Sequence, residues 1–382
     1  MKASQFVKRL LGTIVASGVL CAPLAANPYR PTDDAKVLAD LPAGAHHTEL
    51  AARRLARGRL DVAVPLAKFY IGQARSTGDL RFLGYAEAVL QPWVAQAAPV
   101  PSALVLQATV QQSRHEFDAA LVTLNRSLSV RPNDAQAWLT QSTILRVLGR
   151  YGEAADACGQ FSRWADVALS VICQQGLKGL NGHLDSAYAT LSALSSQGML
   201  DTERVWRDAE LGEMAVRLGR DADAERWFRD DLQLSPRDFY VRAAYADLLL
   251  TQHRSSEVLA LLKGEESIEP LLLRLAIAQK QQNDPGLARS RALLEAAFSA
   301  ESARGEAVHR REQARFLLEV QNNPQAALVA ALANWAVQRE PDDILVLVNA
   351  AHSAAAMQKA APAIEFAHTQ GLTDVRLARL GV

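Results

Sequence analysis

The chain of 382 residues is 49% hydrophobic and 21% charged, which is enough apolar material to bury an extensive core. Its 41 Lys and Arg residues equal its 41 Asp and Glu residues, and this balance excludes a general electrostatic attraction to nucleic acid or to an anionic membrane surface. Neither is expected as a partner. Aromatic residues make up only 6% while Ala and Leu are abundant, a composition that favours helices.

Residues 1–26 have the three-part pattern of a secretory signal peptide. The basic residues Lys2, Lys8 and Arg9 precede an apolar run at residues 10–20. The small residues Ala22, Ala25 and Ala26 follow this run. Because the run is shorter than the roughly 20 residues that cross a bilayer, we expect cleavage after Ala26 in preference to a membrane anchor. Lipidation of Cys21 is the less favoured alternative, since Leu20 stands where a small residue is required. The mature chain is predicted to be exported, periplasmic or secreted, without a membrane span.

The rest of the chain is predicted to be helical after an irregular lead-in at residues 27–47, which is rich in Pro and Asp. Residues 48–100 contain helical stretches at 61–75 and 79–97, which predict a degenerate repeat that caps the N-terminal end. From 101 to 375, apolar helical runs alternate with short breaks, and 376–382 form a tail. No segment has the alternation of a half-buried strand, so an all-α fold is expected.

An internal repeat is visible when residues 101–134 are aligned with 135–168 at a shift of 34. The alignment pairs Leu104 with Trp138, Phe117 with Tyr151, Ala120 with Ala154, and Leu124 with Cys158. A later copy carries Gly212, Gly219, Ala224, Phe228 and Pro236 at matching places. These residue types at these spacings resemble the tetratricopeptide repeat, a 34-residue helix-turn-helix unit.

The resemblance implies a right-handed superhelical solenoid of antiparallel helix pairs, with about eight repeats between 101 and 375. One small-residue position of the second helix falls, in successive units, on Ala120, Ala154, Ala187, Ala224, Val258, Ala288, Ala327 and Ala363. The physical reason for small residues is that paired helices approach closely where they cross, so Ala108, Ser142 or Gly212 on the first helix must face Ala120, Ala154 or Ala224 on the second. Turn and stop positions are predicted at Gly149, Gly182, Gly219, Pro132, Pro236 and Pro341.

The family resemblance also implies where a partner binds, because the first helices of successive repeats line the concave groove. The residues that map to groove positions, and are the candidate partner-binding residues, are Thr109, Gln112, Gln136, Thr140, Thr143, Arg146, Trp206, Glu210, Glu213, Arg217, Tyr240 and Asp247. The expected function is a non-enzymatic protein-interaction scaffold of the bacterial cell envelope, with a protein or peptide as partner. The alternative is a carbohydrate-binding accessory of a polysaccharide export or modification system, with Trp206 and Tyr240 stacking on sugars.

No catalytic residue, cofactor or metal is expected. The sequence contains no Gly-x-Ser-x-Gly, His-Glu-x-x-His or Cys-x-x-Cys motif and no phosphate-binding loop. The histidine pair His46 and His47 has no third ligand nearby. Cys158 and Cys173 fall on neighbouring helices of the stack, where they either form a disulfide or remain two separate buried thiols. Gly176 and Gly179 fall on one face of a first helix, and we expect them to allow a close helix approach, with a widened groove as the alternative.

Overall fold

The computed structural model describes residues 45–304 and 308–382, and it divides into two units, residues 1–47 and 48–382. The predicted signal peptide and nearly all of the predicted lead-in therefore lie outside the described residues. Helix α1 (Ala45–Ala56) begins within the last residues of the expected lead-in, so helical structure starts slightly earlier than predicted. The helical array belongs to the second unit.

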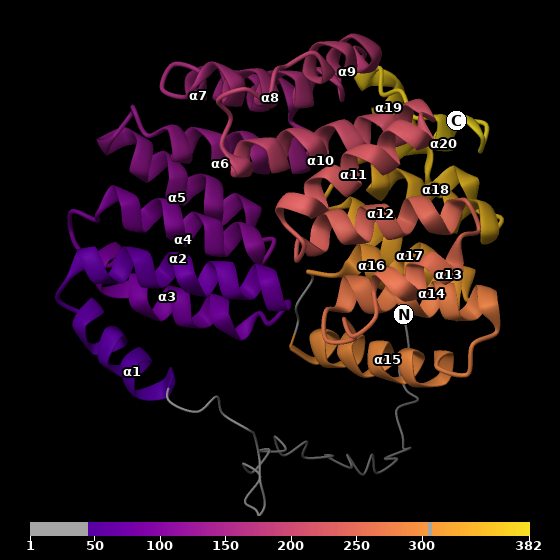
Figure 1. The fold of residues 1–382 in the computed structure, drawn as a ribbon, viewed down its shortest axis with the longest axis horizontal. Coiled ribbons are helices and arrows are strands. Elements are labelled where there is room, and N and C mark those ends of the chain that lie inside the picture. Colours follow the sequence, from indigo (N-terminus) through magenta and orange to yellow (C-terminus); the bar gives the residue numbers. More distant parts are fainter. Residues whose placement is uncertain (1–44, 305–307) are drawn as a thin grey trace, which may run out of the picture. The chain divides into compact units, whose positions relative to one another are not determined.

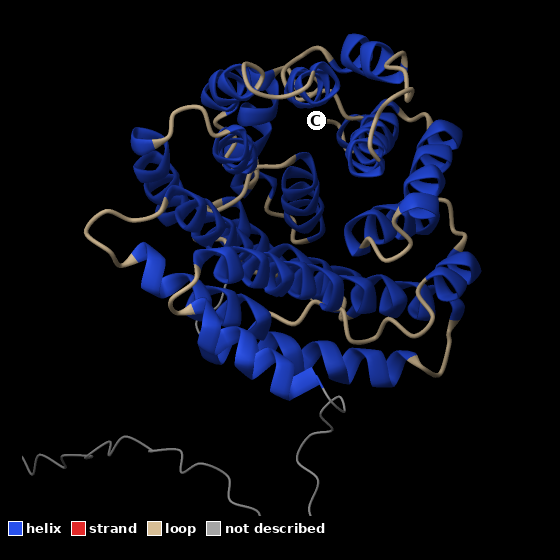
Figure 2. Cartoon of the chain, turned by 60° about the vertical axis from the view of Figure 1, so that its left-hand side comes forward, coloured by secondary structure: helices blue, strands red, loops and turns tan. Residues whose placement is uncertain are grey.

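Within the described ranges every regular element is a helix, and no strand occurs (Figure 2). This confirms the predicted all-α fold. The N-terminal half contains α2 (Leu60–Thr77), α3 (Arg81–Val94), α4 (Pro101–Ser113), α5 (Phe117–Val130), α6 (Ala135–Val147), α7 (Tyr151–Phe161), α8 (Val167–Lys178) and α9 (Leu184–Ser192). The middle contains α10 (Asp201–Leu218), α11 (Asp221–Leu234), α12 (Phe239–Thr251), α13 (Ser255–Leu261), α14 (Glu269–Gln282) and α15 (Leu287–Arg304).

The C-terminal part begins with α16 (Arg310–Arg315), which continues into a π-helical turn at Phe316–Val320. It then contains α17 (Pro324–Trp335), α18 (Pro341–Ser353), a 3₁₀ turn at Met357–Lys359, α19 (Ala361–Gln370) and α20 (Val375–Ala378). Helix α20 therefore occupies part of the stretch that was expected to be a tail. None of the described helices combines the length and apolarity needed to cross a bilayer.

Consecutive helices pack as pairs, and the pairs stack along the chain (Figure 1). The pairs are α2 with α3, α4 with α5, α6 with α7, α8 with α9, α10 with α11, α12 with α13, α14 with α15, α16 with α17, and α18 with α19. Each pair buries one face within itself and another against its neighbours, so the apolar core is distributed along the stack. This is the solenoid architecture expected from the repeat.

The turn within each pair has the same backbone conformation in the described structure. Gly149, Gly182 and Gly219 have φ values of 71°, 74° and 71°, in the left-handed region that glycine adopts without steric cost, as predicted. The equivalent turns of the other pairs use Gly78, His115, His253, Asn283, Asn322 and Ala355, all with positive φ. The repeat is thus more regular in its backbone than in its sequence.

Two positions differ from the predicted pattern. Seven of the eight aligned small residues are completely buried, but Ala288 is exposed, and Ser290 is the small residue that α15 buries. The shift arises because the turn between α14 and α15 continues through Gly286, so α15 begins only at Leu287. Pro341 does not stop a second helix as predicted, because α17 already ends at Trp335; it is the first residue of α18, where a missing N–H costs nothing.

The stack also makes contacts between pairs that are far apart in the sequence. The Arg339 backbone N–H donates to the Val147 carbonyl at 2.8 Å, and the Tyr151 hydroxyl donates to the Arg339 carbonyl at 3.3 Å. The rings of Tyr151 and Phe366 lie 5.8 Å apart, and α20 contacts α10 (Figure 1). The C-terminal pairs are therefore packed against the α6–α10 region, which neighbour-only stacking does not predict.

Candidate functional site

A cavity with a volume of about 2080 Å³ lies among the helix pairs of the second unit. Its wall is formed mainly by the first helices of successive pairs, which contribute residues from α4, α6, α10, α12, α14, α16 and α18. The packing of α17–α20 against the α6–α10 region adds residues such as Gln338, Arg376 and Arg379 to the same wall. The predicted groove face is thus the inner face of a cavity.

Six of the twelve predicted partner-binding residues line this cavity: Gln112, Arg146, Glu213, Arg217, Tyr240 and Asp247. The structure brings them together from α4, α6, α10 and α12. Tyr240 is the most accessible large apolar side chain of this set, at 49% exposure. These six residues form the part of the predicted site that shares one surface.

The other six residues, Thr109, Gln136, Thr140, Thr143, Trp206 and Glu210, do not line the cavity. The hydroxyls of Thr109 and Thr143 donate to carbonyls one helical turn back, and Thr140 is buried and receives a hydrogen bond from Gln136 at 3.2 Å. Trp206 is partly buried and packs against two core clusters. Position within the repeat predicted the helix face but not which side chains the neighbouring pair covers.

The first group of charges on the wall is centred on Arg146, which connects α6 to α10. Its guanidinium pairs with Glu210, and it lies 3.6 Å from Glu213. Burial acts to lower the pKa of Arg146, but the two carboxylates outweigh burial and hold the pKa above its usual range. Burial, followed by the charge of Glu210, raises the pKa of Glu213 to about 7, and the Tyr240 hydroxyl donates to Glu213. The group links three first helices, α6, α10 and α12.

Gly176 and Gly179 explain how α10 approaches α8 closely enough for this arrangement. A Cβ at Gly176 would lie 3.1 Å from a Glu210 carboxylate oxygen, and one at Gly179 would lie 3.0 Å from the Met214 methyl group. Arg217 passes over the same surface and donates to the Gly179 carbonyl at 2.6 Å. The expected close approach is therefore present, and the space left by the two glycines is filled by side chains of α10.

Asp247 of α12 anchors a second group of charges. It accepts from Arg274 of α14 at 2.7 Å and from Arg315 of α16 at 2.9 Å, and Arg315 also pairs with Glu319 at 2.7 Å. Burial would raise the pKa of Glu312, but the neighbouring Arg311 and Arg274 outweigh it and lower the pKa to about 2. Of these residues only Asp247 was predicted, because an ion pair between helices depends on which helices meet.

A third group lies where α18 meets α20. Arg376 pairs with Asp342 at 2.8 Å and with Asp374 at 2.7 Å. Burial acts to raise the pKa of Asp342, but Arg376 and then Arg311 reverse the effect and lower it to about 2. The ionic contacts on the wall thus extend from α6 to α20, and they bind the pairs to one another as well as facing the cavity.

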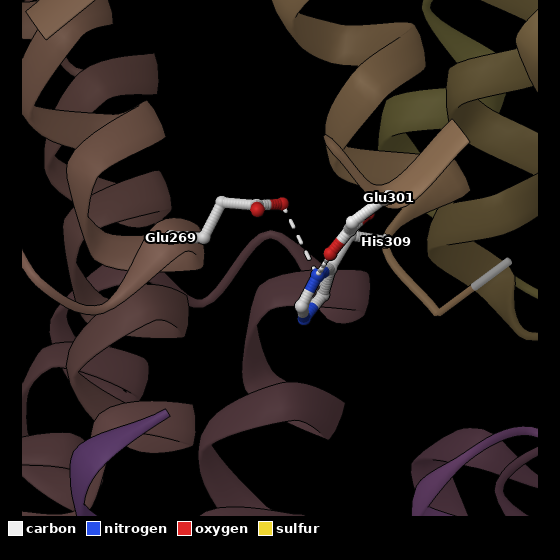
Figure 3. A group of neighbouring side chains, drawn as sticks. All are labelled: Glu269, Glu301 and His309. Atoms are coloured by element: carbon white, nitrogen blue, oxygen red, sulfur yellow. Dashed lines mark hydrogen bonds and ion pairs between the residues drawn. The ribbon is translucent and has the colours of Figure 1, made fainter. Parts of the chain in front are cut away.

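Glu269, Glu301 and His309 form a compact cluster on the same wall (Figure 3). The His309 Nδ1 atom lies 2.5 Å from a Glu301 carboxylate oxygen and 3.2 Å from a Glu269 carboxylate oxygen. Burial would lower the pKa of His309, but its bond to Glu301 and the charge of Glu269 outweigh burial and raise the pKa to about 9. The sequence did not suggest this cluster, because its members are separated by 32 and 8 residues and match no ligand motif.

The chemistry available on this wall is that of recognition. Its arginines and carboxylates are similar in number and are largely paired with one another. A partner's carboxylate or guanidinium can exchange with one member of such a pair and keep the remaining charge satisfied. Tyr240 adds an aromatic surface next to the charges.

The two predicted cysteines lie outside the cavity, on α7 and α8. Their Sγ atoms are 2.16 Å apart and their Cα atoms are 6.2 Å apart, as in a disulfide. Both residues are buried in the core between these helices. The bond joins the second helix of one pair to the first helix of the next.

No family model matches the chain, and no curated protein matches it in sequence. Solved structures do resemble it. A thermophilic TPR protein of Thermus thermophilus is 19% identical over 53% of this chain and 99% of its own, with a TM-score of 0.39. A tetratricopeptide repeat protein from Parabacteroides merdae is 16% identical over 62% and 93%, with a TM-score of 0.40. Human IFIT1, solved as a dimer with PPP-AAAA, is 14% identical over 78% and 69%, with a TM-score of 0.48.

These likenesses concern the helical fold alone, because one fold can carry many unrelated functions. The repeat is evident in this chain itself, from the 34-residue alignment, the buried small residues and the left-handed turn in each pair. On those grounds the chain is an all-α solenoid of helix pairs whose repeat resembles the tetratricopeptide repeat.

Proposed function

We propose that the chain is a non-enzymatic protein-interaction scaffold that binds an extended segment of a protein partner in the cavity, within the cell envelope of a bacterium. The observation that carries the proposal is the cavity wall, on which Arg146, Glu213, Arg217, Tyr240 and Asp247 come together from three first helices. Export is inferred from the signal-peptide pattern of residues 1–26.

The size and charge of the cavity favour a peptide over other ligands. Its volume of about 2080 Å³ exceeds the range of roughly 300–1,000 Å³ that is usual for small-molecule sites. Its mixed charges present no field of a single sign, which a polyanion such as nucleic acid would require. A peptide with both acidic and basic side chains matches this wall.

The carbohydrate-binding alternative is weaker than the sequence suggested. It relied on two aromatic side chains in the groove, but Trp206 packs into the core and only Tyr240 faces the cavity. Tyr240 is therefore the one predicted stacking residue that remains available to a sugar ring.

Site-specific photo-crosslinking in intact cells tests the proposal. A photoreactive phenylalanine analogue at Tyr240 is expected to capture a specific protein, and the same analogue at Trp164 is the matched control. Trp164 is similarly accessible, at 54% exposure against 49% for Tyr240, but it is not part of the cavity wall. Equal capture from both positions, or capture of RNA from position 240, would contradict the proposal.

Binding by the purified chain gives a second measurement. With the captured partner, Tyr240→Ala is expected to weaken affinity by about tenfold or more, as truncation of a central aromatic contact does. Trp164→Ala is expected to leave affinity unchanged. N-terminal sequencing of the chain recovered from the cell envelope tests export, and the expected first residue is Asn27.

A further inference from the structure

Glu269, Glu301 and His309 present three ligand atoms to one point on the cavity wall. They come from three elements: Glu269 is the first residue of α14, Glu301 lies in the last turn of α15, and His309 immediately precedes α16. The three ligand atoms all lie within 4.8 Å of one another. In Figure 3 both carboxylates point toward the same edge of the imidazole ring.

A proton on the His309 Nδ1 atom cannot form hydrogen bonds with both carboxylates at once. The Nδ1 atom of His309 faces both carboxylates, at 2.5 Å from Glu301 and 3.2 Å from Glu269, yet an N–H group carries a single hydrogen and points at one acceptor. A protonated imidazole with two carboxylates also leaves a net charge of −1. A divalent cation at the centre accepts a lone pair from each of the three atoms and neutralises both carboxylates.

The ligand types and spacing fit a first-row divalent metal. Zn²⁺ binds His nitrogen at about 2.0–2.1 Å and carboxylate oxygen at about 2.0–2.2 Å, so its ligand atoms lie roughly 3.0–3.5 Å apart. The 3.2 Å separation already falls in that range, and the 2.5 Å contact lengthens once the hydrogen bond is replaced. An imidazole ligand disfavours Mg²⁺ and Ca²⁺, which take oxygen ligands.

Two arginines of the same wall are engaged by carboxylates outside the cluster. Arg274 pairs with Asp247 and Glu312, and Arg311 pairs with Glu340 and Asp343. Glu301 forms an ion pair with His309. All three ligands belong to the cavity wall, so the remaining coordination positions are open to water or to a carboxylate of a bound partner.

We propose that Glu269, Glu301 and His309 bind one divalent first-row transition-metal ion, with Zn²⁺ as the representative ion, on the wall of the cavity. The site rests on the geometry of these side chains and holds whether or not a peptide binds beside Tyr240. The proposed metal site can therefore be tested independently of the proposed scaffold function.

Calorimetric titration of the chelator-treated full chain with Zn²⁺ alone tests the site. The native chain is expected to show one saturable site and a higher melting temperature with Zn²⁺. Glu301→Gln and His309→Gln are each expected to abolish the saturable binding and the thermal shift. Glu295→Gln on the same helix is the control and is expected to behave like the native chain, since Glu295 is 47% exposed and lies outside the cavity.

X-ray absorption at the zinc edge separates this site from adventitious binding by the N-terminal cysteine, and the Glu301 and His309 variants separate it from binding by other histidines. The expected spectrum shows nitrogen and oxygen ligands without sulfur, and circular dichroism verifies that both variants are folded. Folded Glu301→Gln and His309→Gln chains that still bind Zn²⁺ like the native chain would overturn the proposal. So would a native chain that binds no Zn²⁺, or a spectrum with sulfur ligation.

Discussion

The Ser142 hydroxyl on α6 donates a hydrogen bond to the backbone carbonyl of Ala154 on α7, at 2.8 Å. These are the two positions at which the repeat alignment placed the helix crossing, and both are buried. The bond shows how closely the paired backbones approach there. In the α10–α11 pair the crossing is closer still, because Gly212 occupies the place of Ser142 and the Phe228 ring lies directly over it.

Gly212→Ala is therefore expected to destabilise the fold. The added Cβ would lie 2.3 Å from a Phe228 ring carbon, so the ring or the helix must move. We expect the free energy of unfolding to fall by about 1–3 kcal/mol, as for other overpacked cores, and urea denaturation measures it. Gly72→Ala is the control: Gly72 is a helix-interior residue with nothing within 4 Å of the added Cβ, and the change is expected to stabilise by about 0.5–1 kcal/mol. Equal free energies of unfolding for the two variants would contradict a close helix crossing at Gly212.

Asp231 of α11 gives stability an unusual pH dependence. It is completely buried, and neither carboxylate oxygen has a hydrogen-bond partner among the described residues. Burial, followed by the charges of Asp238 and Asp208, raises the pKa of Asp231 from 3.8 to about 7. Between these values the folded state holds a proton that the unfolded chain has released. The contribution of Asp231 to stability therefore falls as pH rises from about 4 to about 7 and is constant above that.

Asp231→Asn should remove this loss. Its free energy of unfolding is expected to exceed that of the native chain by about 1–3 kcal/mol at pH 8, because the amide cannot ionise and so avoids the cost of a buried unpaired charge, and to show no such gain at pH 4. Denaturant titrations at the two pH values measure the difference. Asp230→Asn, one residue away and less buried, is the control and should show no pH-dependent gain. A gain for Asp231→Asn that is the same at both pH values would argue against this assignment.

The Cys158–Cys173 pair can be tested by thiol titration. With the bond formed, the denatured, unreduced full chain should expose one free thiol, that of Cys21, and three after reduction. Cys158→Ser should lower the free energy of unfolding by about 3 kcal/mol in the chain-entropy model for a loop of this length. Three free thiols before reduction would show that the cysteines remain separate.

Phe366 tests the contact between the C-terminal pairs and α7. Its ring lies 5.8 Å from that of Tyr151 and 5.5 Å from that of Trp335. Phe366→Ala is expected to cost roughly 0.5–3 kcal/mol and to speed amide hydrogen exchange at Arg339, whose N–H bonds to Val147. Phe69→Ala is the control, because Phe69 is 54% exposed in the α2–α3 pair. Unchanged exchange at Arg339 in the Phe366 variant would show that the contact does not depend on this ring.

The local parts of the fold were predictable from the sequence, and the parts that depend on distant helices were not. The turns at Gly149, Gly182 and Gly219 and the crossing of Ser142 with Ala154 depend on neighbours within one repeat, so spacing was enough to place them. Ala288 was misplaced because spacing cannot show that a turn is lengthened.

The candidate site was only half predictable for the same reason. Arg146, Glu213 and Tyr240 share a face that the repeat defines, and they do line the cavity. Trp206 occupies a similar repeat position, but a neighbouring pair covers it. The Glu269–Glu301–His309 cluster needs three elements to meet, and no spacing within the sequence encodes that meeting.

The bonds between Arg339 and the α6–α7 turn have a consequence for how the chain folds. In an open array each pair is stabilised by its neighbours and can form as soon as they have been synthesised. Here the hydroxyl of Tyr151 bonds to the carbonyl of Arg339, which lies 188 residues later in the chain. The α6–α10 region therefore emerges from the ribosome long before the C-terminal pairs that cover it, and closing so long a loop is slow. During that interval the apolar edge near Tyr151 lacks its cover, and it is there that a chaperone would be needed.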